Sequence, residues 1–203
     1  MKILLGTGNA HKIIEMTRII KEYEAQTGEI FEILSLKDFK KFPEPVEDGT
    51  TFEENAYLKA KYYYELTKIP TITDDSGIYV DYLKGPGIYS ARFAGENATD
   101  EENRQKLMKS LKNIPMSQRS ARFVSAVAVV FPDGKEFVVR GTCEGQIGFE
   151  EKGKNGFGYD SLFIVNGYNK TFAEIPSTIQ NAISHRANSL KLMKAEFRKR
   201  VGK

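Results

Sequence analysis

The sequence predicts an α/β protein with a central mixed β-sheet flanked by helices. Strand-like and helix-like segments alternate in the first part of the chain, a pattern typical of parallel strands joined by helices. Later, two long strand-like segments flank Pro132-Asp133-Gly134, which is a hairpin signal. The 203 residues contain no repeat or clear linker, so we expect one domain spanning residues 1–203.

Each element has its own local signal. β-prone apolar runs predict strands, in chain order, at 2–5, 31–36, 70–73, 78–80, 121–131, 136–147 and 162–165. Helical spacing of apolar residues or a capping pattern predicts helices at 13–23, 52–66, 99–111 and 184–200. Between 73 and 78 we expect the chain to leave the strand and turn at Asp74-Asp75-Ser76-Gly77.

Composition argues against several classes of protein. Thirty basic and 27 acidic residues give a net charge of +3, too mild to indicate a nucleic-acid-binding surface. No apolar run approaches the length of a membrane span, and the N-terminus lacks a signal-peptide pattern. The single cysteine, Cys143, excludes an intramolecular disulfide and fits a reducing compartment. We therefore expect a cytoplasmic protein that binds neither membranes nor nucleic acids.

The turn Thr7-Gly8-Asn9-Ala10-His11-Lys12 joins the first strand to the first helix. A helix N-terminus presents unpaired N–H groups and a positive dipole end, and Lys12 adds an ammonium, so a phosphate is the natural ligand. The run is not a Walker motif, because no glycine stands directly before the lysine and no Ser or Thr directly after it. An ordinary strand-to-helix connection capped by Asn9 explains the same residues.

Carboxylates supply the second candidate. Asp74 and Asp75 are adjacent, and paired carboxylates suit a hard divalent cation, although Asp is also common in turns. Glu47 lies in an irregular connection, where a charged side chain is ordinarily solvated and has no functional role. Asn55 and Lys59 share a helix face, and a solvent-facing pair accounts for them equally well.

Two later motifs could recognise a nucleotide base. Glycines 153, 156 and 158 surround Phe157, and an exposed aromatic held in this way suits stacking on a planar base, with a flexible hairpin tip as the alternative. His185 and Arg186 stand at the start of the last helix and offer donors to an electron-rich group. Arg186 could instead pair with a surface carboxylate.

Taken in order, the motifs resemble the inosine/xanthosine triphosphate pyrophosphatase family over essentially the whole chain, from residue 3 to about residue 195. The runs that carry the resemblance are Thr7 to Lys12, Thr51-Phe52-Glu53-Glu54-Asn55-Ala56 with Lys59-Ala60, Asp74-Asp75-Ser76-Gly77, Ser90-Ala91-Arg92, Phe157-Gly158-Tyr159-Asp160 and Ser184-His185-Arg186. The resemblance implies an elongated mixed sheet, two lobes with a substrate cleft between them, and a homodimer.

The resemblance also implies roles for individual residues. It assigns Glu47 and Asp75 to a Mg²⁺ ion, with Asp75, beside Asp74, as the proton acceptor. It assigns the remaining matched positions to the substrate, namely Thr7, Gly8, Asn9, Ala10, His11, Lys12, Lys59, Ser76, Arg92, Phe157, Gly158, Tyr159, Asp160, Gln180, His185 and Arg186. Gln180 departs from the family, which usually has a lysine there, so one cationic contact is in doubt.

The implied activity is hydrolysis of ITP, dITP and XTP to the monophosphate and pyrophosphate, by Mg²⁺-assisted attack of water at the α-phosphorus. Donors from His185 and Arg186 would fit the 6-oxygen of hypoxanthine or xanthine and would be left unpaired by the 6-amino group of adenine. Two other classes remain open: a regulator that binds a triphosphate without cleaving it, and a nucleic-acid-binding protein that uses the basic C-terminal helix.

Overall fold

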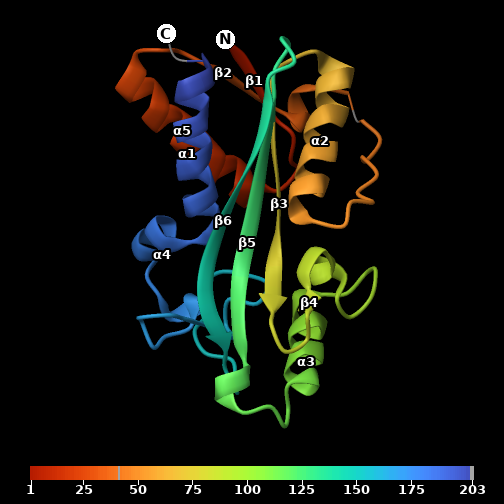
Figure 1. The fold of residues 1–203 in the computed structure, drawn as a ribbon, viewed down its shortest axis with the longest axis vertical. Coiled ribbons are helices and arrows are strands. Elements are labelled where there is room, and N and C mark those ends of the chain that lie inside the picture. Colours follow the sequence, from red (N-terminus) through yellow and green to blue (C-terminus); the bar gives the residue numbers. More distant parts are fainter. Residues whose placement is uncertain (41, 202–203) are drawn as a thin grey trace. The chain divides into compact units, whose positions relative to one another are not determined.

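A computed structural model describes residues 1–40 and 42–201. Within them, one seven-stranded sheet has the order β2-β1-β3-β5-β6-β7, with β4 paired to β3. β1 pairs in parallel with β2 and β3. β4 pairs antiparallel with β3, and β7 pairs antiparallel with β6. The predicted α/β class with a mixed sheet flanked by helices is confirmed (Figure 1).

The elements follow the predicted order closely. The strands are β1 (Lys2–Leu5), β2 (Glu32–Ser35), β3 (Thr71–Val80), β4 (Gly85–Pro86), β5 (Ser120–Val130), β6 (Glu136–Ile147) and β7 (Phe163–Val165). The α-helices are α1 (Ala10–Thr27), α2 (Phe52–Thr67), α3 (Asp100–Ser110), α4 (Ser177–Ile183) and α5 (His185–Val201). The short 3₁₀ helices are η1 (Leu36–Asp38), η2 (Gly87–Arg92), η3 (Met116–Gln118) and η4 (Phe172–Glu174). No helix in the described ranges is both long and apolar enough to cross a membrane.

The chain divides into two compact units. The first comprises Met1–Asp75, Ser125–Gly141 and Arg186–Lys203, and the second comprises Ser76–Val124 and Thr142–His185. Strands β3, β5 and β6 each contribute residues to both units.

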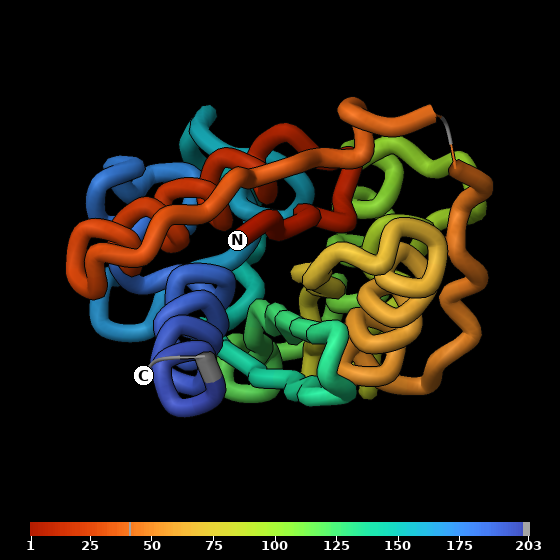
Figure 2. Tube along the Cα trace, turned by 90° about the horizontal axis from the view of Figure 1, so that it is seen from above, coloured from red at the N-terminus to blue at the C-terminus, as the bar shows by residue number. Residues whose placement is uncertain are grey.

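In the first unit, α1 and α5 cover one face of the strands and α2 covers the other (Figure 2). The alternation along β3 explains this arrangement, because neighbouring strand residues point to opposite faces. Ile72 packs in the core beside α1 and α5, where Tyr23 and Phe197 meet edge to face at 5.4 Å between ring centroids. Thr73 faces the other way and donates its hydroxyl to the Ala56 carbonyl of α2 at 2.6 Å.

The second unit has a separate core. Leu107 and Leu111 of the α3 segment are fully buried with Ile78 and Val80 of β3. Phe123 packs against Phe163 with ring centroids 4.5 Å apart. A capping box at Thr99 and Glu102 starts α3 and sets the position of the helix relative to the loop before it.

One sequence prediction about the elements is wrong, and one helix was not predicted. Asp74 to Gly77 does not turn but continues β3 as an unbroken strand, and Gly77 instead serves close packing, because a Cβ there would collide with Ser90. The sequence analysis also missed α4, a seven-residue helix that ends at Ile183, just before α5 begins.

Candidate active site

The turn after β1 holds Lys12 in the first turn of α1. Asn9 caps the helix, since its Oδ1 accepts from the backbone N–H groups of His11 at 2.9 Å and Lys12 at 3.3 Å. The Asn9 backbone N–H in turn donates to Thr7 Oγ1 at 3.2 Å. Gly6 permits the close approach, because a Cβ there would lie 2.6 Å from Thr73 Cγ2. The capped connection and the lysine-bearing helix start are therefore both present.

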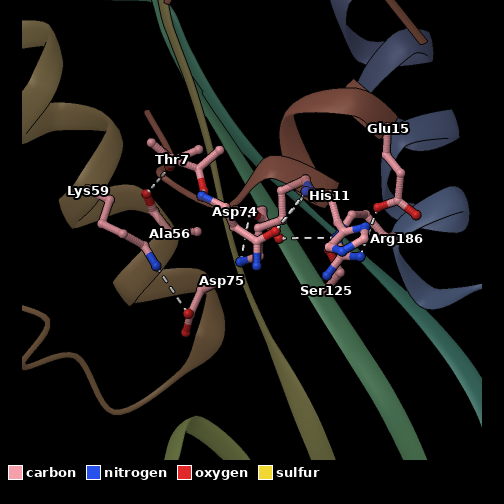
Figure 3. A network of polar contacts seen from close by, with 12 residues as sticks. Thr7, His11, Glu15, Ala56, Lys59, Asp74, Asp75, Ser125 and Arg186 are labelled. Carbon is pink, nitrogen blue, oxygen red and sulfur yellow. Dashed lines mark hydrogen bonds and ion pairs between the residues drawn. The ribbon is translucent and has the colours of Figure 1, made fainter. Parts of the chain in front are cut away.

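Asp74, Arg186 and Glu15 form a buried ionic network (Figure 3) that Lys12 joins. Nζ of Lys12 lies 3.0 Å from Oδ1 of Asp74, whose side chain is completely buried. Nε of Arg186, at the start of α5, lies 3.5 Å from the other oxygen of Asp74. The Arg186 NH1 group donates to Glu15 of α1 at 2.8 Å, so one guanidinium bridges two carboxylates.

Charges decide the ionisation of Asp74. Burial acts to raise its pKa, but Lys12 and Arg186 outweigh burial and hold the pKa below its ordinary value. The pKa of Arg186 is raised, because the attraction of Asp74 and Glu15 exceeds the desolvation cost. Asp74 and Arg186 are therefore both ionised, and removing either one leaves an uncompensated charge in the interior.

Lys59 of α2 organises a second cluster, formed by Glu47 and Asp75. Its ammonium lies 2.9 Å from Glu47 Oε2 and 3.1 Å from Asp75 Oδ1. The connection that carries Glu47 is tied to α2, since the Gly49 N–H donates to Asn55 Oδ1 at 2.9 Å. Asn55 is thus a buried structural partner and not part of a solvent-facing pair.

The pKa values of the two aspartates are shifted in opposite directions. Burial raises the pKa of Asp75 above its ordinary value, and the ammonium of Lys59 offsets this only in part. A carboxylate whose pKa is raised in this way binds protons better than a solvated one and suits a general base. Burial acts to lower the pKa of Lys59, but Asp75 and Glu47 outweigh it, so the lysine remains charged.

Both clusters contribute to one pocket of about 410 Å³ within the first unit. Its lining includes Thr7, Gly8, Lys12, Glu47, Lys59 and Asp74. The structure thus brings together predicted residues that lie up to 67 positions apart in the sequence.

The donor set fits a magnesium ion. Glu47 Oε2 and Asp75 Oδ1 lie 2.9 and 3.1 Å from the same atom, Lys59 Nζ, which holds the two hard oxygens close together. In the described ranges, no group of three or more His, Cys, Asp or Glu side chains forms a metal cage. Mg²⁺ commonly binds through one or two carboxylates and completes its shell with phosphate oxygens and water, so two carboxylates are sufficient.

Charge supports the same conclusion. Three cations and four carboxylates make up the two clusters, namely Lys12, Lys59, Arg186, Glu15, Glu47, Asp74 and Asp75. These side chains carry no surplus positive charge with which to bind a polyanion. A divalent cation on Glu47 and Asp75 would supply it.

The second unit carries the glycine-rich loop. The side chain of Phe157 is exposed, while Tyr159 is buried and donates its hydroxyl to the Ser90 carbonyl at 2.7 Å. Asp160 accepts from the Phe157 backbone N–H at 3.1 Å and lies over Gly156, where a Cβ would collide with it. Phe157 and Gly158 line a pocket of about 190 Å³.

The other predicted residues of this unit have structural partners. Arg92 stacks over the ring of Tyr89 at 5.2 Å and lies 3.8 Å from Glu96. The Gln180 side-chain amide donates to the Phe172 carbonyl. His185 stacks on Phe123 with ring centroids 5.0 Å apart. Ser76 lies on β3 directly after Asp75. Their assignment to the substrate stays a prediction.

Comparison with known proteins decides the family. The model of the Ham1 family matches residues 3–196. The chain belongs to the Ham1 family. The resemblance to inosine/xanthosine triphosphate pyrophosphatases is thereby confirmed, as curated relatives carry that activity in their names.

Two such relatives are named dITP/XTP pyrophosphatase. The protein from Exiguobacterium sibiricum is 46% identical over 197 residues, covering 96% of both chains. The protein from Haemophilus influenzae is 44% identical over 199 residues, covering 97% of this chain and 98% of the relative. Among solved structures, the Staphylococcus aureus Ham1 protein superposes with a TM-score of 0.88 at 36% identity, covering 98% of this chain and 99% of the other.

One residue of the buried ionic network was not predicted. Glu15 holds Arg186 in the first unit, and it was not among the residues selected from the sequence. A signal was available, because Glu15 follows Lys12 by three positions and therefore lies on the same face of α1. Its partner Arg186 lies 171 positions away, so its role could not be assigned from local spacing.

Proposed function

We propose that this Ham1 protein hydrolyses dITP, ITP and XTP to the nucleoside monophosphate and pyrophosphate. The observation that carries the proposal is the pocket of the first unit. Its lining includes Lys12, Lys59, Glu47 and Asp74. The names of the curated relatives support the same substrates.

The residues of the first unit would divide the chemistry between them. Lys12 binds phosphate oxygens at the positive end of the α1 dipole, and Lys59 binds them on the side of Asp75. Asp75 accepts the proton of the attacking water. Asp74 holds Lys12 and Arg186 in place as the buried counter-ion. A Mg²⁺ ion held by Glu47 and Asp75 would neutralise phosphate charge at the reacting phosphorus.

The base would be recognised by residues of the second unit. Phe157 offers an exposed ring for stacking, and His185 offers a donor for the 6-oxygen of hypoxanthine or xanthine. Arg186 was assigned the same task by resemblance, while in this structure its Nε and NH1 atoms face Asp74 and Glu15. We therefore assign Arg186 first to the buried network.

A nucleotide panel tests the proposal. Purified protein is incubated with dITP, ITP, XTP, dATP and dGTP, with and without Mg²⁺, and pyrophosphate and orthophosphate are measured separately. We expect Mg²⁺-dependent pyrophosphate release from the first three. Release of orthophosphate alone, or equal rates with dATP, would contradict the proposal, and tight binding without turnover would favour a regulator.

Two further properties are proposed, a homodimer on the resemblance and a cytoplasmic location on the composition. The single cysteine, which is buried, fits a reducing compartment. Sedimentation of the purified protein measures the oligomeric state, and a monomer at micromolar concentration would contradict the dimer.

A further inference from the structure

Helix α3 holds the loop that carries Phe157 by its backbone. The Gly158 N–H donates to Oδ2 of Asp100 at 2.7 Å, and the Gly158 carbonyl accepts from NH1 of Arg104 at 3.0 Å. Asp100 and Arg104 are four residues apart on α3, so they share one helix face. Both polar backbone groups of one glycine are therefore bound by oppositely charged side chains of the same helix.

Arg104 is itself fixed. Its Nε donates to Oε2 of Glu151 at 2.8 Å, and the same carboxylate oxygen accepts from the Ser161 hydroxyl at 2.9 Å. The planar guanidinium thus bonds a carboxylate with one nitrogen and the Gly158 carbonyl with another, a geometry that a lysine cannot reproduce. The side chain of Arg104 is 19% exposed, so solvent competes with these bonds only weakly.

The loop would otherwise have many conformations available. Gly156 and Gly158 both adopt left-handed backbone angles, with φ of +81° and +56°. We call the two bonds from Asp100 and Arg104 to Gly158 the clamp. In addition to the clamp, Asp160 binds the Phe157 N–H. Yet 51% of Phe157 stays exposed, so the backbone is held while the ring remains accessible.

We propose that Asp100 and Arg104 are positioning residues that order Phe157 for stacking before the base arrives. Ordering a loop in advance removes its entropy cost from the binding step, and this gain appears in affinity and not in the chemical step. The inference rests on the proposed function where it gives Phe157 the task of stacking on a base.

The kinetic test uses Asp100→Ala and Arg104→Ala with dITP and XTP as substrates. Matched controls are Glu101→Ala, which removes another acidic residue from the first turn of α3, and Lys109→Ala, which removes another cation from the same helix. Loss of one charge-assisted hydrogen bond predicts a KM about 5- to 10-fold higher, with kcat within about 2-fold of wild type. The controls are expected to keep the wild-type KM.

Conservative variants separate positioning from folding. Asp100→Asn keeps an acceptor oxygen and is expected to restore most of the affinity, whereas Arg104→Lys cannot serve both partners and restores less. If the Ala variants lowered kcat at an unchanged KM, or if the controls raised KM equally, the inference would be overturned.

A second measurement needs no turnover. The chain has no tryptophan, so Phe157→Trp places a single tryptophan in the loop, and its fluorescence can be excited apart from that of the tyrosines. In that background, Asp100→Ala and Arg104→Ala should lower the fluorescence anisotropy and raise acrylamide quenching in the absence of nucleotide. Unchanged anisotropy and quenching would reject the clamp even if wild-type protein cleaves dITP. Failure of wild-type protein to release pyrophosphate would reject the proposed function and leave this measurement as the test of the clamp.

Discussion

The two units arrange their candidate binding groups in opposite ways. In the first unit, charged side chains are buried and neutralise one another, as Asp74 does between Lys12 and Arg186. In the second unit, charged side chains instead bind the backbone of a loop and leave the Phe157 ring exposed. The first arrangement suits charge recognition, and the second suits stacking.

The difference predicts different responses to mutation. A buried ionic network is costly to break, because every member that is removed leaves an unpaired charge in the interior. A tethered loop with an exposed ring costs little stability to alter, since solvent already surrounds the ring. Mutations in the first unit should therefore affect turnover and stability, and those in the second mainly KM.

The largest expected effect is on turnover. Asp75→Asn should lower kcat by about 10³-fold, because the amide cannot accept the proton of the attacking water. Pyrophosphate release measures the rate, and thermal unfolding checks that the fold is retained. Glu53→Gln, which alters a more exposed carboxylate of α2, is the control. Wild-type turnover by Asp75→Asn would reject Asp75 as the base.

The next effect is on stability. Asp74→Ala should lower the free energy of unfolding by about 3 kcal/mol, because Lys12 and Arg186 lose their buried counter-ion. Urea denaturation measures the change. Glu32→Gln is the control, since the Glu32 side chain is 59% exposed in its pair with Lys2 and should change stability by less than about 1 kcal/mol. Equal losses in the two variants would contradict the buried network.

Much of this architecture was predictable from local sequence. The strand at 2–5, the start of α1 and the hairpin around Asp133 each have a signal within a few residues, because a cap, a turn or an alternation is a local property. The order of the motifs predicted the family. The first-unit residues that we propose for the triphosphate, such as Lys12 and Lys59, were selected on that basis.

Contacts between distant segments were not predictable in this way. Asp74 to Gly77 looks like a turn, but the pairing of β3 within the sheet overrides that local preference. Glu15 with Arg186, and Asp100 with Gly158, are side-chain contacts across 171 and 58 positions. Only the folded chain reveals which carboxylate reaches which partner.

A smaller effect is expected in the second unit. Phe157→Ala should raise KM for dITP by roughly 10-fold, the effect of losing one base-stacking contact, with little change in kcat or melting temperature. Tyr168→Ala, which removes another exposed aromatic of the same unit, serves as the control. A lower kcat at constant KM would assign Phe157 to the chemical step and would remove the contrast between the units.

The smallest effect concerns a feature that the units share. Glu54 of α2 and Glu102 of α3 close equivalent capping boxes, and hydrogen bonds from Thr50 and Thr99 lower the pKa of each below its ordinary value of 4.5. A lowered pKa in the folded state adds stability above pH 4.5, which is lost as the pH falls through the folded-state value. Glu54→Gln and Glu102→Gln should therefore melt slightly below wild type at pH 7 and approach it at pH 3, as circular dichroism can measure. Both losses should have the same sign, with the larger one at Glu54, which accepts from Thr50 as well as from Thr51. A loss confined to one variant would show that the units differ in helix capping as well as in their binding groups.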